Sequence, residues 1–513
     1  MARLLRTALA AAAALVPTCA HAAWQVAHSK HFIIYADEPR AELQTFSTQL
    51  EKFDLAVRRA RGMDDPVVGD GNRLTVFVLP TAAMVQRLYG DKTGFIGGFY
   101  KGPASGPLAY VARRTDNDPG GNFSNVIFFH EYSHHLMFQT ADRPVPAWIV
   151  EGFAEFMSTV RFDRDGSVGL GAPANHRAWS LLEGPTLPIE SLLSVNASTL
   201  PKEQRESFYA RGWLLVHYLT FEKSRAGQLD HYADLFAKGT PSLDAARSAF
   251  GDLHKLDHEL NLYVQQPRLT YLKLSGAALQ PGPIDIEPLT EGASKVILLR
   301  ATLKNGVGGA DAQTLAAQIR AVEANYPGDE LVEASLAEAE FVTDQPEAAL
   351  AAADRAIKAN PNSTEPLVLK GKALEALAEK ADGERSDALF EQARSTFIAA
   401  NKIDSEDPEP LMEFYETFPR EGKPPNPNAI AALHYASSLA PQDLGLRMNS
   451  ALIYLREGNL AQARSAIIPI AYDPHGEEFS SIARQMLAKI DAGDAQGALL
   501  AASAGATQSA KAR

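Results

Sequence analysis

The sequence is almost without cysteine. Cys19 is the only one in 513 residues, so the chain forms no internal disulfide, and beyond Cys19 the metal ligands must be His, Asp or Glu. An excess of positive charge is missing as well. The formal net charge of −13 opposes binding to phosphate backbones and to anionic membranes, so we expect no nucleic-acid partner.

Long hydrophobic runs are also missing. No stretch reaches the ~20 apolar residues that a membrane-spanning helix needs, so we expect no transmembrane segment. Residues 1–22 instead have the pattern of a signal peptide, with early arginines, an apolar stretch and a small-residue cleavage site before residue 23. We therefore predict an exported protein, periplasmic or secreted. Lipid attachment at Cys19 is the alternative, and Thr18 argues against it because a smaller residue is expected there.

The composition is that of a folded protein, and the length predicts two to four domains. Up to about residue 270, short strands mix with amphipathic helices. The patterns predict strands at 31–36, 74–79 and 107–113, and helices at 40–61, 124–139, 147–160, 206–223, 227–238 and 253–264. We predict an α+β domain over residues 23–275. The mixture of Gly, Pro and acidic residues that follows predicts a linker at 276–310.

The second half of the chain is periodic. A proline follows a predicted helix at five positions: Pro327, Pro361, Pro408, Pro441 and Pro474. The intervals of 34, 47, 33 and 33 residues resemble the 34-residue unit of tetratricopeptide repeats, which is a pair of helices. We predict such all-α repeats over 311–495, an insertion between two helices at 380–386 and a flexible tail at 496–513. An Ala-rich helical bundle without repeats is the alternative.

The most informative segment is His130-Glu131-Tyr132-Ser133-His134. On a helix, two imidazoles four residues apart project from one face and can bind one metal ion. The carboxylate of Glu131 then lies beside a metal-activated water as a candidate general base. A second acidic helix follows, with Glu151 and Glu155 facing the same way. A third ligand from that helix would leave one tetrahedral position of a zinc ion open for water.

Residues 130–134 and 148–155 resemble the corresponding segments of the gluzincins, zinc peptidases whose third ligand is a glutamate. The nearest resemblance is to the bacterial peptidase-MA-like group, which joins this domain to tetratricopeptide repeats. It extends weakly over residues 24–270. The resemblance implies three ligands for Zn²⁺: His130, His134 and Glu151. It also implies that Glu131 is the general base and that residues 23–275 form a zinc metallopeptidase-like domain.

The same resemblance implies further roles. In the family, a carboxylate one turn after the third ligand orients the first histidine, and Glu155 occupies that position. A tyrosine or histidine also donates a hydrogen bond to the oxyanion of the reaction. Tyr209 is the first candidate for this donor and His217 the second. His135 points about 100° away from His134 on a helix, so it is not assigned as a ligand.

Zinc-dependent hydrolysis of peptide bonds is the predicted function. An aminopeptidase of this type would carry a Gly-x-Met-Glu-Asn segment, which the sequence lacks, so endopeptidase action is favoured. The predicted substrate is a peptide or protein. It could add as a further strand to an edge of the sheet, for which the strand at 108–113 is the candidate.

Three alternatives stay open. The two histidines could be polar residues of a buried helix, with Glu151, Glu155 and Tyr209 in purely structural roles. The repeats could be the working part, so that the chain is a protein-interaction scaffold with a vestigial peptidase domain. The same water and base would also hydrolyse an amide that is not a peptide.

Overall fold

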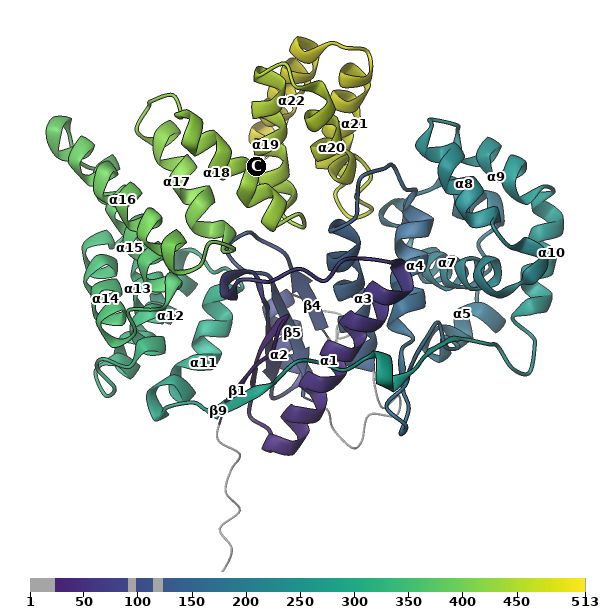
Figure 1. The fold of residues 1–513 in the computed structure, drawn as a ribbon, viewed down its shortest axis with the longest axis horizontal. Helices are drawn as coiled ribbons and strands as arrows, with labels where there is room; N and C mark the ends of the chain where they lie inside the picture. The colour runs from purple at the N-terminus through teal and green to yellow at the C-terminus, as the bar shows by residue number, and fades with distance from the viewer. Residues whose placement is uncertain (1–23, 91–97, 114–122, 513) are drawn as a thin grey trace, which may run out of the picture.

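The computed structural model of the protein describes residues 24–90, 98–113 and 123–512 (Figure 1). The predicted signal peptide, with Cys19, lies outside these residues. An N-terminal α/β region is followed by an all-helical, repeat-like region, which confirms the predicted fold class at this coarse level. No helix within the described ranges is both long and apolar enough to cross a membrane.

A six-stranded mixed sheet forms the centre of the α/β region. In spatial order its strands are β4 (Gly98–Lys101), β5 (Leu108–Ala112), β3 (Leu74–Leu79), β2 (Phe32–Ala36), β1 (Gln25–His28) and β9 (Asp285–Pro288). β2, β3 and β5 are parallel, whereas β4, β1 and β9 pair antiparallel with their neighbours. The parallel neighbours β2 and β3 are joined by the helix α1 (Arg40–Arg61), as such a pair requires a crossover connection.

Both faces of the sheet are apolar and covered. In β3, Val76 and Val78 belong to one core cluster, while Phe77 and Leu79 belong to another, because successive side chains point to opposite faces. The first face packs against α1 and α3 (Phe123–Phe138), and the second against α2 (Ala82–Tyr89) and α11 (Glu291–Lys304). The sheet therefore supports α3, the helix that carries the His-Glu-x-x-His motif.

The rest of the α/β region is mainly helical. It comprises α4 (Ala147–Ser158), α5 (Ala178–Leu182), α6 (Ile189–Ser194), α7 (Lys202–Phe221), α8 (Gln228–Ala237), α9 (Ser242–Phe250) and α10 (Leu253–Tyr263). A small antiparallel sheet contains β6 (Arg161–Phe162), β7 (Val168–Leu170) and β8 (Leu272–Leu274). The predicted helices at 40–61, 124–139, 147–160, 206–223, 227–238 and 253–264 correspond to α1, α3, α4, α7, α8 and α10.

Two glycines let α4 and α7 cross closely. A Cβ added to Gly152 would lie 2.7 Å from the carbonyl oxygen of Gly212 and 2.9 Å from Cγ2 of Val216. A Cβ on Gly212 would in turn lie 3.4 Å from Cα of Gly152. Because Gly152 directly follows Glu151, this crossing sets the position of the predicted third ligand.

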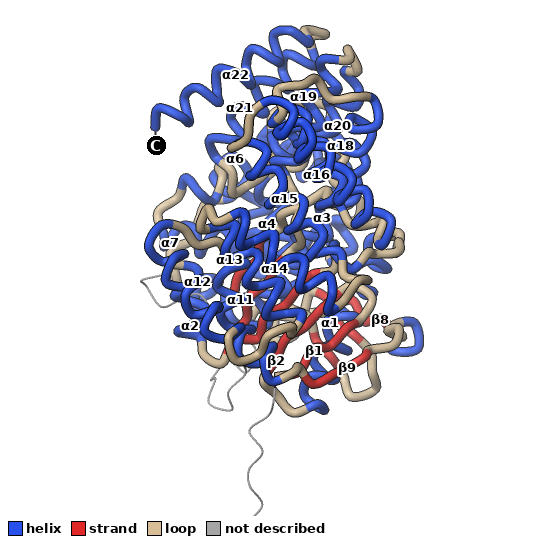
Figure 2. Tube along the Cα trace, turned by 90° about the vertical axis from the view of Figure 1, so that its left-hand side faces the viewer, coloured by secondary structure: helices blue, strands red, loops and turns tan. Residues whose placement is uncertain are grey.

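The repeat region is a series of helices, each packed mainly on its neighbours in the chain. They are α12 (Gly309–Glu323), α13 (Glu330–Val342), α14 (Pro346–Ala359), α15 (Thr364–Glu379), α16 (Gly383–Ile403), α17 (Pro408–Arg420), α18 (Pro427–Leu439), α19 (Leu444–Arg456), α20 (Leu460–Ala471), α21 (Glu477–Asp491) and α22 (Ala495–Ala512). Figure 2 shows the strands gathered in one part of the molecule, with helices making up the rest. Each of the five repeating prolines follows the end of an even-numbered helix from α12 to α20.

Two predicted boundaries differ from the structure. The predicted linker at 276–310 contains β9, which completes the six-stranded sheet beside β1, and α11, which covers one face of that sheet. The predicted flexible tail at 496–513 falls within α22 as far as Ala512. In both segments, pairing or packing with distant residues overrides a local composition that is typical of loops or tails.

Two smaller predictions were also wrong. The long repeat interval comes from the 16- and 21-residue helices α15 and α16, and not from an insertion, because only residues 380–382 separate them. The strand predicted at 107–113 is β5, which pairs with β3 on one side and β4 on the other. The outer strand is β4, which the sequence analysis did not predict, because only four residues form it.

A buried acidic cluster lies between α15 and α17. Glu375 is fully buried, and neither carboxylate oxygen has a hydrogen-bond partner among the described residues. Its closest cation is Arg420, whose Nη1 is 3.8 Å from Oε2. Burial raises the pKa of Glu375 to about 8, and the nearby Glu413 adds to this effect. Glu375 is thus protonated in the folded state at a pH where it is ionised in the unfolded chain.

We expect Gly152→Ala to lower the free energy of unfolding by about 1–3 kcal/mol, because a Cβ there meets the backbone of α7. Gly282→Ala is the matched control, since nothing lies within 4 Å of a Cβ at that position. Denaturant unfolding followed by circular dichroism measures both. Equal stability of the two variants would contradict a tight crossing of α4 and α7.

We expect Glu375→Gln to become more stabilising as the pH rises. The folded carboxyl has the higher pKa, so the wild-type protein loses stability between about pH 4.5 and pH 8, at up to about 1.4 kcal/mol per pH unit. Glutamine has no proton to lose, so the variant lacks this slope. Unfolding free energies across this pH range test the prediction, with the exposed Glu384→Gln as a control that should run parallel to the wild type.

Candidate metal centre

The helix α3 holds its motif between the sheet and α4. Phe128, Phe129, Tyr132 and Leu136 are buried in the main core cluster. His130 and His134, four residues apart, lie together on the side that faces α4. The helical periodicity of α3 therefore anchors one face in the core and presents both imidazoles on another.

Three predicted ligands meet at one point. Nε2 of His130 and Nε2 of His134 are 3.1 Å apart. Oε2 of Glu151 lies 3.3 Å from the first nitrogen and 3.5 Å from the second. One ligand atom from each of the three residues lies within 4.8 Å of the others. Such a spacing lets all three bind a single cation at ~2.0–2.2 Å.

Glu151 is the most deeply buried member of this group. Its side chain is 0% exposed, and neither carboxylate oxygen has a hydrogen-bond partner among the described residues. Burial opposes ionisation, but the charge of His134 and contacts with His130 hold the pKa of Glu151 well below its usual range. A buried ionised carboxylate without hydrogen bonds, facing two imidazoles, fits a divalent metal ion, and His₂Glu is a donor set of catalytic zinc.

Glu155 lies on the other side of His130, one turn along α4. Its Oε1 is 3.3 Å from Nδ1 of His130. Arg177 donates to both oxygens of Glu155, at 2.6 and 3.2 Å, and His176 Nε2 lies 3.0 Å from Oε2. Burial opposes ionisation of Glu155, but the charge of Arg177 keeps its pKa well below the usual range. Arg177 in turn pairs with Glu206 of α7.

The two carboxylates act together on His130. Burial alone would lower the pKa of this histidine, but its contacts with Glu151 and Glu155 raise it to about 10. The surroundings of His130 therefore favour a positive charge at this point. A proton on Nδ1 facing Glu155 leaves the Nε2 lone pair directed at His134 and Glu151, where a metal ion can take it.

Glu131 and Tyr209 flank the three ligand residues. Glu131 is half-buried on α3, and its carboxylate makes no hydrogen bond or ion pair with another residue in the part of the chain that the structure describes. The ring of Tyr209, on α7, meets the ring of His130 edge-on at 6.0 Å. The guanidinium of Arg177 lies 5.2 Å from the centre of the same tyrosine ring. Burial and the charge of Glu151 raise the pKa of Tyr209, so its hydroxyl remains a hydrogen-bond donor.

His217 and His135 are engaged elsewhere. Nδ1 of His217 is 3.0 Å from the hydroxyl of Tyr263, and its Nε2 is 3.0 Å from the carbonyl oxygen of Thr270. His217 is therefore a core histidine with both nitrogens occupied, which favours Tyr209 over it as the oxyanion donor. His135 contacts the hydroxyl of Tyr100 at 2.8 Å and stacks on Tyr132, away from the other two histidines of α3.

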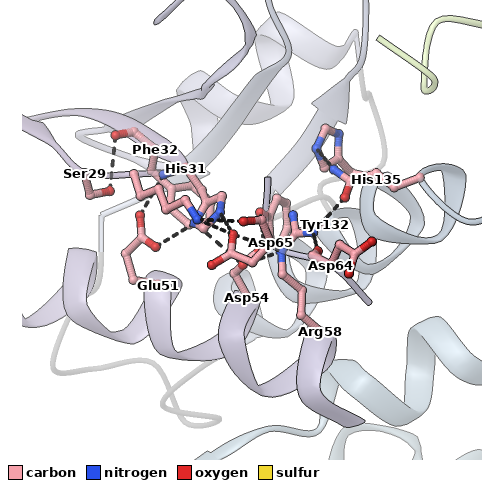
Figure 3. Close-up of polar contacts among 12 residues, drawn as sticks. Ser29, His31, Phe32, Glu51, Asp54, Arg58, Asp64, Asp65, Tyr132 and His135 are labelled. Carbon is pink, nitrogen blue, oxygen red and sulfur yellow. Dashed lines mark hydrogen bonds and ion pairs between the residues drawn. The ribbon is translucent and has the colours of Figure 1, made fainter. Parts of the chain in front are cut away.

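A buried polar network attaches the back of α3 to α1 (Figure 3). The hydroxyl of Tyr132 donates to Asp54 at 2.8 Å, and Nε of Arg58 donates to the other oxygen of that carboxylate at 2.7 Å. Nδ1 of His31 lies 2.7 Å from Glu51. Since Tyr132 lies within the His-Glu-x-x-His motif, this network fixes the rotation of α3 about its axis.

Part of this network also has metal-ligand spacing. Atoms of His31, Asp54 and Asp65 lie within 4.8 Å of one another. Unlike Glu151, these groups have protein partners: Asp54 accepts from Tyr132 and Arg58, and His31 contacts Glu51 and Asp65 at 2.7 and 3.0 Å. The charges are thus neutralised within the protein, and this group does not fit a metal as the first one does.

Three residues at the candidate metal centre were not found by sequence reasoning. His176 and Arg177 hold Glu155, and His475 of the repeat region lies 3.1 Å from Oε1 of Glu151. None of them belongs to a motif with a fixed spacing from α3 or α4. His475 directly follows Pro474, the last proline of the repeat series, but that position carries no sign of a contact with the metal centre.

The chain has a similar solved structure but no significant match at the level of sequence families. No family model matches the sequence, and no curated protein matches it significantly. Among solved structures, the chain is similar to a thermophilic TPR protein from Thermus thermophilus. The identity is 18% and the TM-score 0.32, over 38% of this chain and 97% of that one.

We expect Glu155→Gln to weaken zinc binding by about 10- to 100-fold, because the charge that orients His130 is removed while the shape is kept. Competition against a chromogenic chelator measures the dissociation constant. The exposed Glu183→Gln is the control and should bind zinc as the wild type does. An unchanged affinity of Glu155→Gln would show that Glu155 only closes an ion pair with Arg177.

Proposed function

We propose that this protein is an exported zinc-dependent peptidase that cleaves internal peptide bonds. The observation that carries the proposal is the meeting of His130, His134 and Glu151 around a point where Glu151 has no hydrogen-bond partner among the described residues. The tight α4–α7 crossing and the Arg177–Glu155 pair support it, because both hold this geometry in place. Zn²⁺ is the proposed cofactor.

The residues divide the chemistry among them. A bound zinc ion supplies Lewis acidity, which makes water a better nucleophile and polarises the substrate carbonyl. Glu131 accepts the proton of the attacking water and delivers it to the leaving amine. Tyr209 donates a hydrogen bond to the carbonyl oxygen as negative charge develops there. Glu155 keeps His130 in the tautomer that turns Nε2 toward Glu151.

The position of the outer strand β4 is an argument for a peptide substrate. It forms one edge of the sheet in the described residues and packs against α3, so an extended peptide paired with it would run beside the metal centre. Pairing through the substrate backbone does not require a free amino terminus, in keeping with endopeptidase action. The helical repeats, which pack around this region, are the proposed site of a protein partner or a protein substrate.

We expect Glu131→Gln to reduce cleavage by about 10²- to 10⁴-fold with no loss of bound zinc, because the proton acceptor is removed and the ligands stay. Mass spectrometry of a proteome-derived peptide library reveals new termini whatever the preferred cleavage sequence is. Zinc content is measured on the same samples. The exposed Glu42→Gln, on α1, is the matched control and should cleave as the wild type does.

The same experiment separates the proposal from the scaffold alternative. If purified wild-type protein carries no zinc under replete conditions, or if Glu131→Gln cleaves as well as the control, the peptidase proposal is wrong. A cellular phenotype that depends on the repeats and persists in Glu131→Gln would favour a protein-interaction scaffold. Cleavage of amides other than peptide bonds would point to a different substrate class for the same machinery.

A further inference from the structure

His475 belongs to the repeat region but lies at the candidate metal centre. It stands in the loop between α20 and α21, which reaches toward α3 and α4 in Figure 1. Its Nε2 is 3.1 Å from Oε1 of Glu151. Its ring meets the ring of His134 at 5.5 Å and 87°. A residue far along the chain thus contacts two of the three proposed ligands.

The conformation of this loop is built by its own hydrogen bonds. Oδ1 of Asp473 accepts from the backbone N–H of His475 at 3.1 Å. The hydroxyl of Ser480 donates to the carbonyl oxygen of Asp473 at 3.2 Å, and Arg484 donates to that of Ala471 at 3.0 Å. The loop is tied to both flanking helices, so His475 is held near Glu151 although its side chain is 53% exposed.

The helices around the loop dock on the α/β region at separate points. The rings of Tyr472 and Phe236, the latter on α8, meet edge-on at 5.7 Å. Arg447 of α19 donates to the carbonyl oxygen of Phe138, the last residue of α3, at 3.1 Å. Asp443, before α19, accepts from the backbone N–H of Ala104 at 2.8 Å. Because these contacts lie at separate points, they fix the position of the α20–α21 loop, and with it His475, relative to the candidate metal centre.

The two oxygens of Glu151 face different partners. Oε2 lies near His130 and His134, whereas Oε1 lies near His475. We propose that His475 is a positioning residue of the metal centre, contributed by the repeat region, which holds Oε1 so that Oε2 stays directed at the metal. This contact parallels the one between Glu155 and His130, except that here the carboxylate is the proposed ligand and the imidazole is the supporting group.

Metal binding and docking of the repeats are then linked. A metal ion fixes Glu151 in the orientation that His475 contacts, and docking of the α20–α21 loop fixes the same orientation for the metal. By thermodynamic reciprocity, each event strengthens the other by the same factor. A protein partner that pulls the repeats away from α8 would therefore weaken the metal centre, and metal loss would loosen the repeats.

This inference rests on the proposed function, because it assumes that a metal binds His130, His134 and Glu151. The test compares full-length His475→Leu, which removes the imidazole nitrogen that lies against Oε1, with His475→Gln, whose amide nitrogen can take its place. We expect Leu to weaken Zn²⁺ binding by about 10- to 100-fold and Gln to restore most of it. His254→Leu, at a side chain that is 90% exposed on α10, is the control.

A spectroscopic readout separates positioning from a general structural effect. Co²⁺ replaces zinc in such sites, and its visible absorption bands report the ligand geometry. We expect His475→Leu to shift these bands and His475→Gln to keep them near the wild type. If His475→Leu binds zinc and shows cobalt bands as the wild type does, the inference is overturned while the peptidase proposal stands. If the wild type binds neither metal, both are overturned.

A variant on the opposite side of the interface tests the linkage without touching His475. Phe236→Ala removes the ring against which Tyr472 packs. We expect this variant to bind zinc more weakly. We also expect its repeat region to separate more readily from the α/β region, which would appear as faster proteolysis between α11 and α22. Added zinc should slow this proteolysis. The double variant Phe236→Ala, His475→Leu should lose less zinc-binding free energy than the sum of the losses in the two single variants. Additive effects on zinc affinity would overturn the linkage.

Discussion

The structure depends on an ionised carboxylate buried without hydrogen bonds from the described residues. Removing such a group from water costs several kcal/mol unless cations surround it. Three imidazole nitrogens face the carboxylate of Glu151, from His130, His134 and His475. Two nearby features hold these imidazoles and Glu151 in position. One is the close crossing of α4 and α7 at Gly152 and Gly212, and the other is Glu155, which accepts hydrogen bonds from Arg177 at both carboxylate oxygens.

Basic and acidic side chains alternate in a row through the candidate metal centre. Arg177 neutralises Glu155, which faces His130, which faces Glu151, which faces His475. These residues come from α3, α4, a turn before α5 and the loop after α20, so four separate parts of the chain must be placed before the row is complete. An arrangement of this kind is costly to assemble for stability alone, since packed apolar residues would serve as well. Its presence fits a site that can hold a metal ion.

Local patterns were enough to predict the elements that carry the motif. Apolar spacing gave the bounds of α1 to the residue and those of α3 and α4 to within one or two residues, because burial on one helical face leaves a periodic trace. The clustering of His130, His134, Glu151 and Glu155 could also be predicted, since the two histidines share one helix face and the two glutamates share another. The chemical role of the cluster remains a prediction.

What the sequence could not predict depends on contacts between distant segments. β9 has a Gly- and Pro-rich neighbourhood that is typical of a linker, and only its partner β1 makes it a strand. Arg177 and His475 follow no spacing rule relative to α4. Tyr209 and His217 lie about two turns apart on one helix, and the resemblance ranked Tyr209 first without any information on the surroundings of either side chain. The partners of His217 in the core, Tyr263 and Thr270, are what distinguish them.

The pairing of β1 with β9 has a consequence for how the chain is made. The first strand to leave the ribosome has no neighbour on its outer side until residues 285–288 are synthesised, and an unpaired strand edge is a template for aggregation. Fragments that end at residue 275 would keep this edge permanently. The α/β region is therefore not an autonomous folding unit up to that point, and chaperone capture during synthesis would protect β1.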